Sequence, residues 1–171
     1  RAAVTLGGQV YPTKTATEVA IEDANRADYG AFAEGDVPLA GERLTLSAGL
    51  RGDDVETRNA GGYYGDRSTS DAALSGYATA TWTFAGDWKA AAQFARGFRD
   101  PTLSDRYFRG VSGRGFVVGN PDLVAETSNQ WDLSVRGRAG VFGLGLSGYV
   151  YRIQNLIERY RSGDDYEFRN R

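Results

Sequence analysis

The sequence from Phe94 to Glu126 reads FARGFRDPTLSDRYFRGVSGRGFVVGNPDLVAE, and it joins two segments in which apolar and polar residues alternate. Two pairs, Asp100-Pro101 and Asn120-Pro121, interrupt this alternation. The residue before a proline favours extended backbone, and proline itself has no amide hydrogen for a strand ladder. The stretch therefore predicts two strands joined by a long, ordered, arginine-rich loop whose entry and exit are set by the prolines.

The same alternation recurs on both sides of this stretch. Apolar residues take every second position, with polar or small residues between them, in segments 29–39, 44–50, 74–84, 88–94, 131–135 and 142–150. A period of two predicts strands with one apolar and one polar face. Residues 153–160 are expected to continue the last of these strands outward. On the polar face, we expect the carboxylates of Glu34 and Asp36 to pair with Arg43 and Arg51.

The connections between these segments alternate in length. Short turns are expected at 40–41, 86–87 and 137–140, and long polar loops at 53–71 and 99–126. A transmembrane β-barrel has short turns at one rim and long loops at the other. Its aromatic girdles lie at the rims, and the apolar face carries Trp82, Phe84 and Trp88 near one short turn. These features indicate a barrel wall of about eight strands.

Composition limits the classes of function. The 171 residues carry a net charge of −2 and include no histidine and no cysteine. Catalytic triads and zinc sites built on those residues are therefore excluded, and the interspersed charges form no basic patch for nucleic acid. No apolar run reaches the ~18 residues of a transmembrane helix, whereas a barrel strand needs only ~9–11. We expect no catalytic residue, no resident metal and no cofactor.

The residues of the central stretch also carry a family resemblance. The segments GFRDPTLS at 97–104, GNPDL at 119–123 and ETSN at 126–129 resemble paired motifs in the barrel of TonB-dependent outer-membrane receptors, usually written FRAP-T-L-S-E and N-P-x-L-K-P-E-x-S. The matching motif residues are Gly97, Phe98, Arg99, Pro101, Asn120, Pro121, Leu123 and Glu126. Asp100 departs from the usual alanine, and Val124-Ala125 from the usual Lys-Pro. Segments 29–51 and 149–157 resemble other strands of the family.

This resemblance implies an all-β fold, an antiparallel up-and-down transmembrane β-barrel, of which residues 1–171 are a partial wall without the plug domain and the barrel ends. It implies active import of a scarce ligand, such as a ferric siderophore or corrinoid, through the outer membrane of a Gram-negative bacterium. The expected partners are outer-membrane lipid and lipopolysaccharide, a small anionic or metal-chelate ligand, and the TonB complex, which would be contacted by regions outside this chain.

Cationic and aromatic residues of the loops are the candidates for ligand binding. Guanidinium groups bind anions in a bidentate way, and aromatic rings supply rigid contact area. The candidates are Tyr63, Tyr64, Arg99, Arg106, Tyr107, Arg109, Arg114 and Phe116. The alternative is that these arginines pair with Asp100, Asp105 and Asp122, or with lipopolysaccharide. Haem-importing members of the family usually place a histidine between the motifs, and residues 102–119 contain none; Tyr107 would be a weak substitute.

Two other architectures compete with the receptor. One is a small outer-membrane barrel acting as an adhesin or hydrolase, and the other is a soluble β-sandwich binding module. In a sandwich the apolar faces of two sheets meet in a dry centre, whereas in a membrane barrel they point outward. Leu46, Ala80, Phe94 and Leu144 mark the apolar face, and their surroundings discriminate between these folds.

Overall fold

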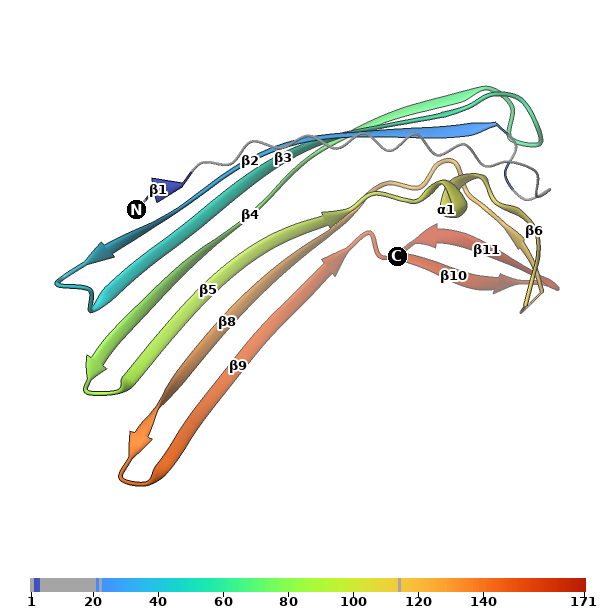
Figure 1. The fold of residues 1–171 in the computed structure, drawn as a ribbon. Coiled ribbons are helices and arrows are strands. Elements are labelled where there is room, and N and C mark those ends of the chain that lie inside the picture. The colour runs from blue at the N-terminus through green and yellow to red at the C-terminus, as the bar shows by residue number, and fades with distance from the viewer. Residues whose placement is uncertain (1, 4–20, 22, 114) are drawn as a thin grey trace.

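The computed structural model describes residues 2–3, 21, 23–113 and 115–171, and most of them lie in strands (Figure 1). The strands are β1 (Ala2–Ala3), β2 (Ala24–Leu39), β3 (Leu44–Asn59), β4 (Arg67–Ala85), β5 (Trp88–Arg99), β6 (Arg109–Ser112), β7 (Gly115–Val118), β8 (Glu126–Ala139), β9 (Phe142–Gln154), β10 (Ile157–Ser162) and β11 (Asp165–Asn170). The described residues form one helix, α1 (Leu103–Tyr107), and none of their helices could cross a membrane.

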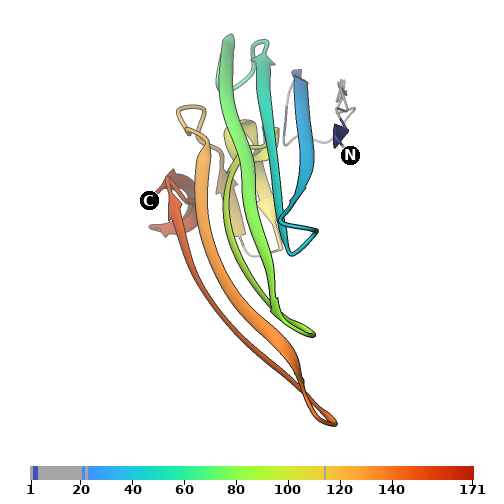
Figure 2. The same ribbon diagram turned by 90° about the vertical axis from the view of Figure 1, so that its left-hand side faces the viewer.

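The long strands form a single curved sheet in the order β1-β2-β3-β4-β5-β8-β9 (Figures 1 and 2). Every neighbouring pair in it is antiparallel. Ala48 lies opposite Ala78, Ala78 opposite Phe94, Phe94 opposite Trp131, and Trp131 opposite Val150. Residues directly opposite one another share a face, so this row defines an apolar face. The predicted all-β, antiparallel up-and-down arrangement is confirmed.

The apolar face is open. Leu46 is 41% exposed, Phe94 38% and Leu144 53%, and no layer of described residues covers them. The apolar side chains therefore do not converge into a dry centre, which contradicts the β-sandwich alternative. At the turn end of this face, the rings of Trp82 and Phe84 lie 5.3 Å apart between centroids.

The polar face is held by side chains that lie across neighbouring strands. The ring of Tyr77 lies over Gly49, where an added Cβ would come within 2.6 Å of it, and its hydroxyl donates to Glu34 at 3.4 Å. Arg51 donates to Asp53, two residues along its own strand. The expected pairing of Glu34 with Arg51 is therefore wrong, because the nearer Asp53 takes the guanidinium and Tyr77 reaches Glu34 first.

Two strand ends differ from the sequence-based prediction. β3 and β4 stay paired from Asp53–Ala73 up to Asn59–Arg67, so the predicted loop at 53–71 is wrong and the turn is only 60–66. The ladder continues there although both faces are polar. Because apolar and polar residues do not alternate in this part, the sequence contains no sign of the paired strands. The turn expected at 137–140 likewise shortens to 140–141, because β8 continues to Ala139.

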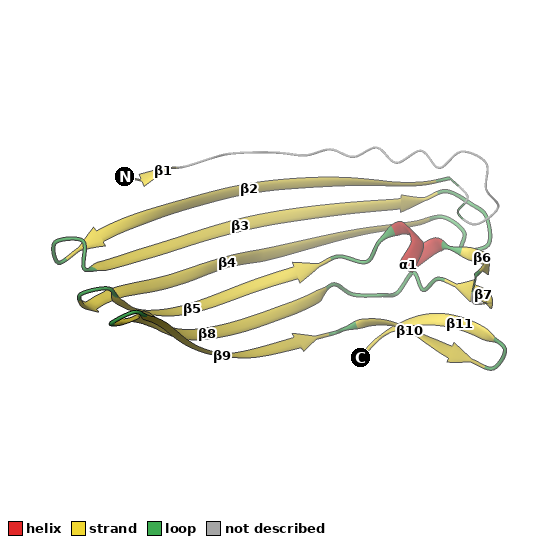
Figure 3. Cartoon of the chain, turned by 60° about the horizontal axis from the view of Figure 1, so that its bottom comes forward, coloured by secondary structure: helices red, strands yellow, loops and turns green. Residues whose placement is uncertain are grey.

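The chain leaves the large sheet at Asn155, whose φ of 55° turns the backbone. Strands β10 and β11 join a second sheet in the order β10-β11-β7-β6 (Figure 3). The expected outward continuation of β9 through residues 153–160 is therefore wrong. Within the described residues, the large sheet contains seven strands and the second sheet four.

The contact between Tyr77 and Gly49 makes a testable prediction about the stability of the wall. Gly49→Ala should lower the free energy of unfolding of the full-length protein by about 1–3 kcal/mol, because its methyl group overlaps the ring. Gly52→Ala on the same strand is the control, since no heavy atom lies within 4 Å of its added Cβ. Urea unfolding in detergent measures both, and equal losses would contradict the proposed contact.

Candidate functional site

The long connection between β5 and β8 folds into an ordered unit at one end of the large sheet. We call residues 100–124 the folded loop; it contains α1 and the hairpin of β6 and β7 (Figure 3). The helix begins with a capping box, in which the Thr102 hydroxyl accepts from the Asp105 amide at 3.1 Å. The Asp105 carboxylate accepts in turn from the Thr102 amide at 2.9 Å. These paired bonds satisfy two backbone donors that a helix start leaves free.

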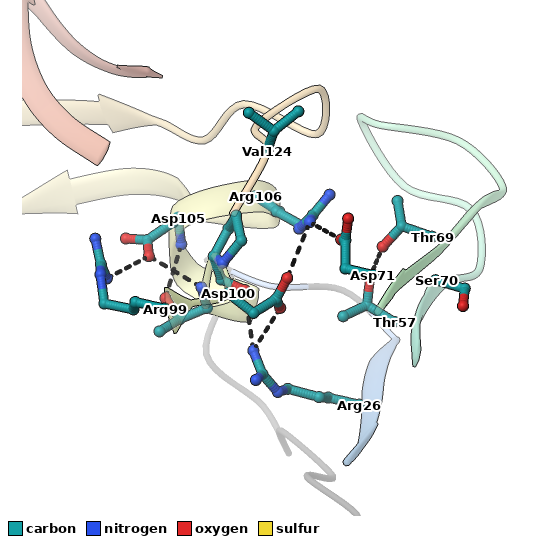
Figure 4. A network of polar contacts seen from close by, with 12 residues as sticks. Arg26, Thr57, Thr69, Ser70, Asp71, Arg99, Asp100, Asp105, Arg106 and Val124 are labelled. Carbon is teal, nitrogen blue, oxygen red and sulfur yellow. Dashed lines mark hydrogen bonds and ion pairs between the residues drawn. The ribbon is translucent and has the colours of Figure 1, made fainter. Parts of the chain in front are cut away.

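A buried ionic network attaches the folded loop to the polar face (Figure 4). Arg106, which is 1% exposed, donates to Asp71 of β4 at 2.7 Å and to Asp100 at 3.4 Å. Asp100 also accepts from Arg26 of β2 at 2.9 Å. Arg106 donates further to the Pro121 carbonyl at 3.1 Å. One arginine of α1 therefore connects the helix, the second proline motif and the wall.

Asp100 is the titratable centre of this network. Burial raises the pKa of Asp100 to about 6, outweighing the opposing effect of Arg106 and Arg26, and the carboxylate of Asp71 adds to the rise. Two carboxylates that share one guanidinium in a buried site disfavour simultaneous ionisation. Docking of the loop, which buries Asp100, therefore favours the protonated form of this carboxyl group.

The second proline motif packs directly on α1. The Gly119 amide donates to Phe108 O at 2.7 Å and the Asn120 amide to Asp105 O at 2.8 Å. An added Cβ at Gly119 would lie 2.7 Å from the carbonyl of Arg106, so this contact requires glycine. The Asn120 side chain donates to Phe168 O at 3.0 Å, which ties the folded loop to β11.

Arg99 and Glu126 are paired with each other where the two flanking strands meet. They lie opposite one another in the β5–β8 ladder, and two guanidinium nitrogens of Arg99 donate to the carboxylate, each at 3.1 Å. Arg99 also contacts Asp105 at 3.3 Å. The motif residues Arg99 and Glu126 thus join the two ends of the folded loop. The guanidinium of Arg99 is paired with the carboxylates of both Glu126 and Asp105.

Two tyrosines among the candidates lie inside the unit. Tyr107 is 1% exposed and packs with Ala24 and Leu103. Tyr64 meets it edge to face, with centroids 5.9 Å apart, and its hydroxyl lies 2.9 Å from Phe108 O and 3.2 Å from Gly119 O. In this conformation Arg106 and Tyr107 are out of reach of a ligand, because neighbouring groups enclose both side chains.

The exposed candidates come together in one place. The guanidinium of Arg109 lies 4.2 Å from the centroid of the Tyr63 ring and 5.2 Å from that of Phe116. Tyr63 is 65% exposed, and no carboxylate of the described part of the chain pairs with Arg109. We call Tyr63, Arg109 and Phe116 the Arg109 cluster. Arg114, the remaining candidate, lies outside the described residues.

The rings of the Arg109 cluster orient the guanidinium without neutralising its charge. Cation–π contacts hold the group over the ring faces, while the N–H donors in its plane stay available for a carboxylate, phosphate or hydroxamate oxygen. A hollow of about 670 Å³ lies on the polar face of the wall, lined by Phe32, Glu34, Arg51, Ser75, Tyr77 and Gln93 among others.

The chain is similar to several known proteins. The family model described as TonB dependent receptor-like, beta-barrel matches residues 2–171. A curated relative, the hemoglobin-haptoglobin utilization protein B of Neisseria meningitidis serogroup C, is 27% identical over 92 residues, which are 52% of this chain and 11% of that protein. The chain thus spans about a tenth of that relative.

Solved structures share the fold. The copper transporter OprC matches with a TM-score of 0.71 at 23% identity, over 88% of this chain and 24% of its own. The hemophore receptor HasR of Serratia marcescens, a double mutant in complex with its hemophore HasA and heme, matches with a TM-score of 0.73 at 15% identity. That match covers 86% of this chain and 30% of HasR.

Removing the central arginine should undock the folded loop. Arg106→Gln removes the cation that half-buried Asp71 and buried Asp100 share, although Arg26 still pairs with Asp100. Breaking a buried ion pair costs at most about 3–5 kcal/mol. In the full-length protein, hydrogen exchange of the folded loop should accelerate strongly. Arg109→Gln is the matched control, since that side chain lies at the surface; similar exchange in both variants would contradict the anchoring role.

The raised pKa of Asp100 predicts how loop docking depends on pH. Between the ordinary value of 3.8 and about 6, the docked state binds more protons than the undocked one, so docking weakens as pH rises through this window. The total change is at most about 3 kcal/mol. Protection factors of the Gly119 and Asn120 amides, corrected for intrinsic exchange, should fall accordingly. Asp100→Asn should abolish this slope, and a slope that persists would exclude Asp100 as its source.

Proposed function

This chain belongs to the TonB-dependent receptor β-barrel family, and from that premise we propose that it forms part of an active transporter of the bacterial outer membrane. Residues 1–171 would be one segment of the barrel wall, with the plug and the barrel ends elsewhere in a longer protein. Energy would reach the transporter from the TonB complex through those other regions. The observation that best supports this proposal is a single-layered sheet, open and apolar on one face and polar on the other.

The orientation follows from the lengths of the connections. Turns at 40–43, 86–87 and 140–141 lie at one end of the sheet, and the turn at 60–66 and the folded loop lie at the other (Figure 1). Long loops of outer-membrane barrels are extracellular. We therefore assign the Arg109 cluster to the extracellular side, at the mouth of the barrel, and the hollow on the polar face to the lumen.

The proposed ligand is a small anionic metal chelate. The proteins named above are described as a copper transporter, a receptor in complex with a hemophore and heme, and a hemoglobin-haptoglobin utilization protein, and copper and heme both bring a metal. The Arg109 cluster offers an oriented cation between two rings, which suits a chelate with carboxylate, hydroxamate or catecholate oxygens. Capture of haem by iron ligation is not proposed for residues 102–119, because they lack histidine and Tyr107 is buried.

Catalysis is not part of the proposal. The two solved structures named above are described as a copper transporter and a hemophore receptor, and the chain has no histidine or cysteine for nucleophilic catalysis. The contribution of this segment would be a lipid-facing wall, a polar lumenal surface and a share of the ligand-binding mouth.

Uptake by cells that carry the full-length protein tests this function. Radiolabelled iron is offered as hydroxamate, catecholate and citrate chelates, and we expect import of at least one that depends on TonB. Arg109→Ala should weaken its binding about tenfold or more, because a hydrogen bond to a charged group is lost. Arg161→Ala, an exposed arginine that contacts Asp164, is the control.

Two outcomes would contradict these assignments separately. If no chelate is imported in a TonB-dependent way, the proposed iron-chelate cargo is wrong, and copper should be tested next. If import occurs but Arg109→Ala and Tyr63→Ala leave the affinity unchanged, the transporter assignment stands and the Arg109 cluster is not the binding site.

A further inference from the structure

Two arginines lie two strands apart in one row across the apolar face of the wall. Arg96 of β5 is opposite Asn129 of β8, and Asn129 is opposite Arg152 of β9. The three residues therefore form a straight row across consecutive strands. Strands lie about 4.8 Å apart, so the two arginine backbones are separated by roughly 10 Å. Both arginines are exposed.

This row borders the apolar surface directly. Two residues along each strand, toward the short turns, lie Phe94, Trp131 and Val150. The rings of Phe94 and Trp131 are 5.3 Å apart between centroids, and both are exposed. The arginines thus lie near the loop-side end of the apolar band, with Phe98 of β5 beyond them, close to the level where a membrane protein meets the lipid head groups.

The charge on this part of the wall is unbalanced. Positions that share the face of Phe94, Trp131 and Val150 on β5, β8 and β9 include no aspartate and no glutamate, and their only charged residues are Arg96 and Arg152. Arg96 donates one bond, at 3.3 Å, to the carbonyl of Leu74 on β4, on the side of β5 away from Asn129, and a phosphate bound at the row would replace this bond. Within the described residues, neither arginine has a carboxylate partner, whereas Arg26, Arg51, Arg99 and Arg106 all do.

We infer that Arg96, Asn129 and Arg152 form a binding site for the phosphate group of an outer-leaflet lipid. Guanidinium groups bind phosphate oxygens in a bidentate way, and the Asn129 amide between them adds a neutral donor. The acyl chains would lie along Phe94, Trp131 and Val150. Arginines at this level can extend to the lipid head groups, and a phosphorylated lipid supplies both an anion for the guanidinium groups and hydrocarbon for the apolar surface.

This inference rests on the proposed function in one respect: the apolar face must lie in the outer membrane with the long loops outside. It does not depend on which ligand is transported or on the Arg109 cluster. A free phosphate or a carboxylate metabolite could satisfy the same donors. The exposed apolar surface beside the arginines favours the lipid, because a free anion gains nothing from it.

Native mass spectrometry of the full-length, delipidated protein in mild detergent tests the site. The probes are bis-phosphorylated lipid A, its dephosphorylated form, and inorganic phosphate as a competitor. We expect the double variant Arg96→Gln, Arg152→Gln to bind phosphorylated lipid A about tenfold more weakly than the wild type. Arg58→Gln is the matched control, since it removes an exposed arginine from the same face of β3.

The wild-type protein provides a second test that does not depend on folding of a variant. The dephosphorylated lipid should bind about tenfold more weakly than the phosphorylated one, and inorganic phosphate should not displace the lipid. Equal binding of the two lipids, unchanged binding by the double variant, or displacement by inorganic phosphate would each overturn the inference. Failed chelate uptake with intact lipid binding would count against the proposed cargo alone.

Discussion

The antiparallel hydrogen-bond ladder of the large sheet is the constraint on which the other features depend. It runs without a slip from β2 to β9 except at the irregularity between Thr83 and Ala85. Because side chains alternate between faces, a shift of one residue in any pair would exchange the two faces of that strand. The ladder therefore decides that Phe94 points to the open side and that Gln93 joins the polar side. The side-chain contact of Tyr77 with Gly49 further stabilises the same register.

The buried network around Arg106 specifies one docked position of the folded loop, which apolar packing alone would not do. Burying charges is costly, and a buried ion pair is weak evidence of net stability. Such a pair does favour one geometry, since each charge needs its partner in place. Asp100 stands where the family motif usually has alanine, and its carboxylate accepts from Arg26 of β2, which also donates to Asp28 and to the Pro101 carbonyl. This departure thus gives the folded loop of this chain a contact with the wall that an alanine could not make.

Alternation in the sequence was sufficient to predict the strands wherever one face is apolar. It failed where both faces are polar, which is why residues 53–59 and 67–71 were expected to form a loop although their backbones remain paired. At the break at Asn155, the strongest signal in the sequence is that asparagine tolerates a positive φ better than most residues do. Of the site, the sequence identified Arg109, Tyr63 and Phe116 individually but not their contact. It also missed Arg26 and Asp71, because a single sequence contains nothing that links residues 35 or 74 positions away to Asp100 and Arg106.

All but two of the 20 basic residues are arginine, and the structure uses that side chain in three different environments. Arg106 is buried among carboxylates, Arg109 lies between aromatic rings, and Arg96 borders the apolar band. A lysine ammonium would suit none of them as well, because it lacks the planar fork and is more strongly hydrated. Arg96 and Arg99 show that arginines in different environments can lie close together on one strand. They are three residues apart on β5, so the alternation of the strand directs Arg96 to the apolar face and Arg99 to the opposite, polar face, where the folded loop begins. The end of one strand can thereby contact lipid on one side and anchor the loop on the other.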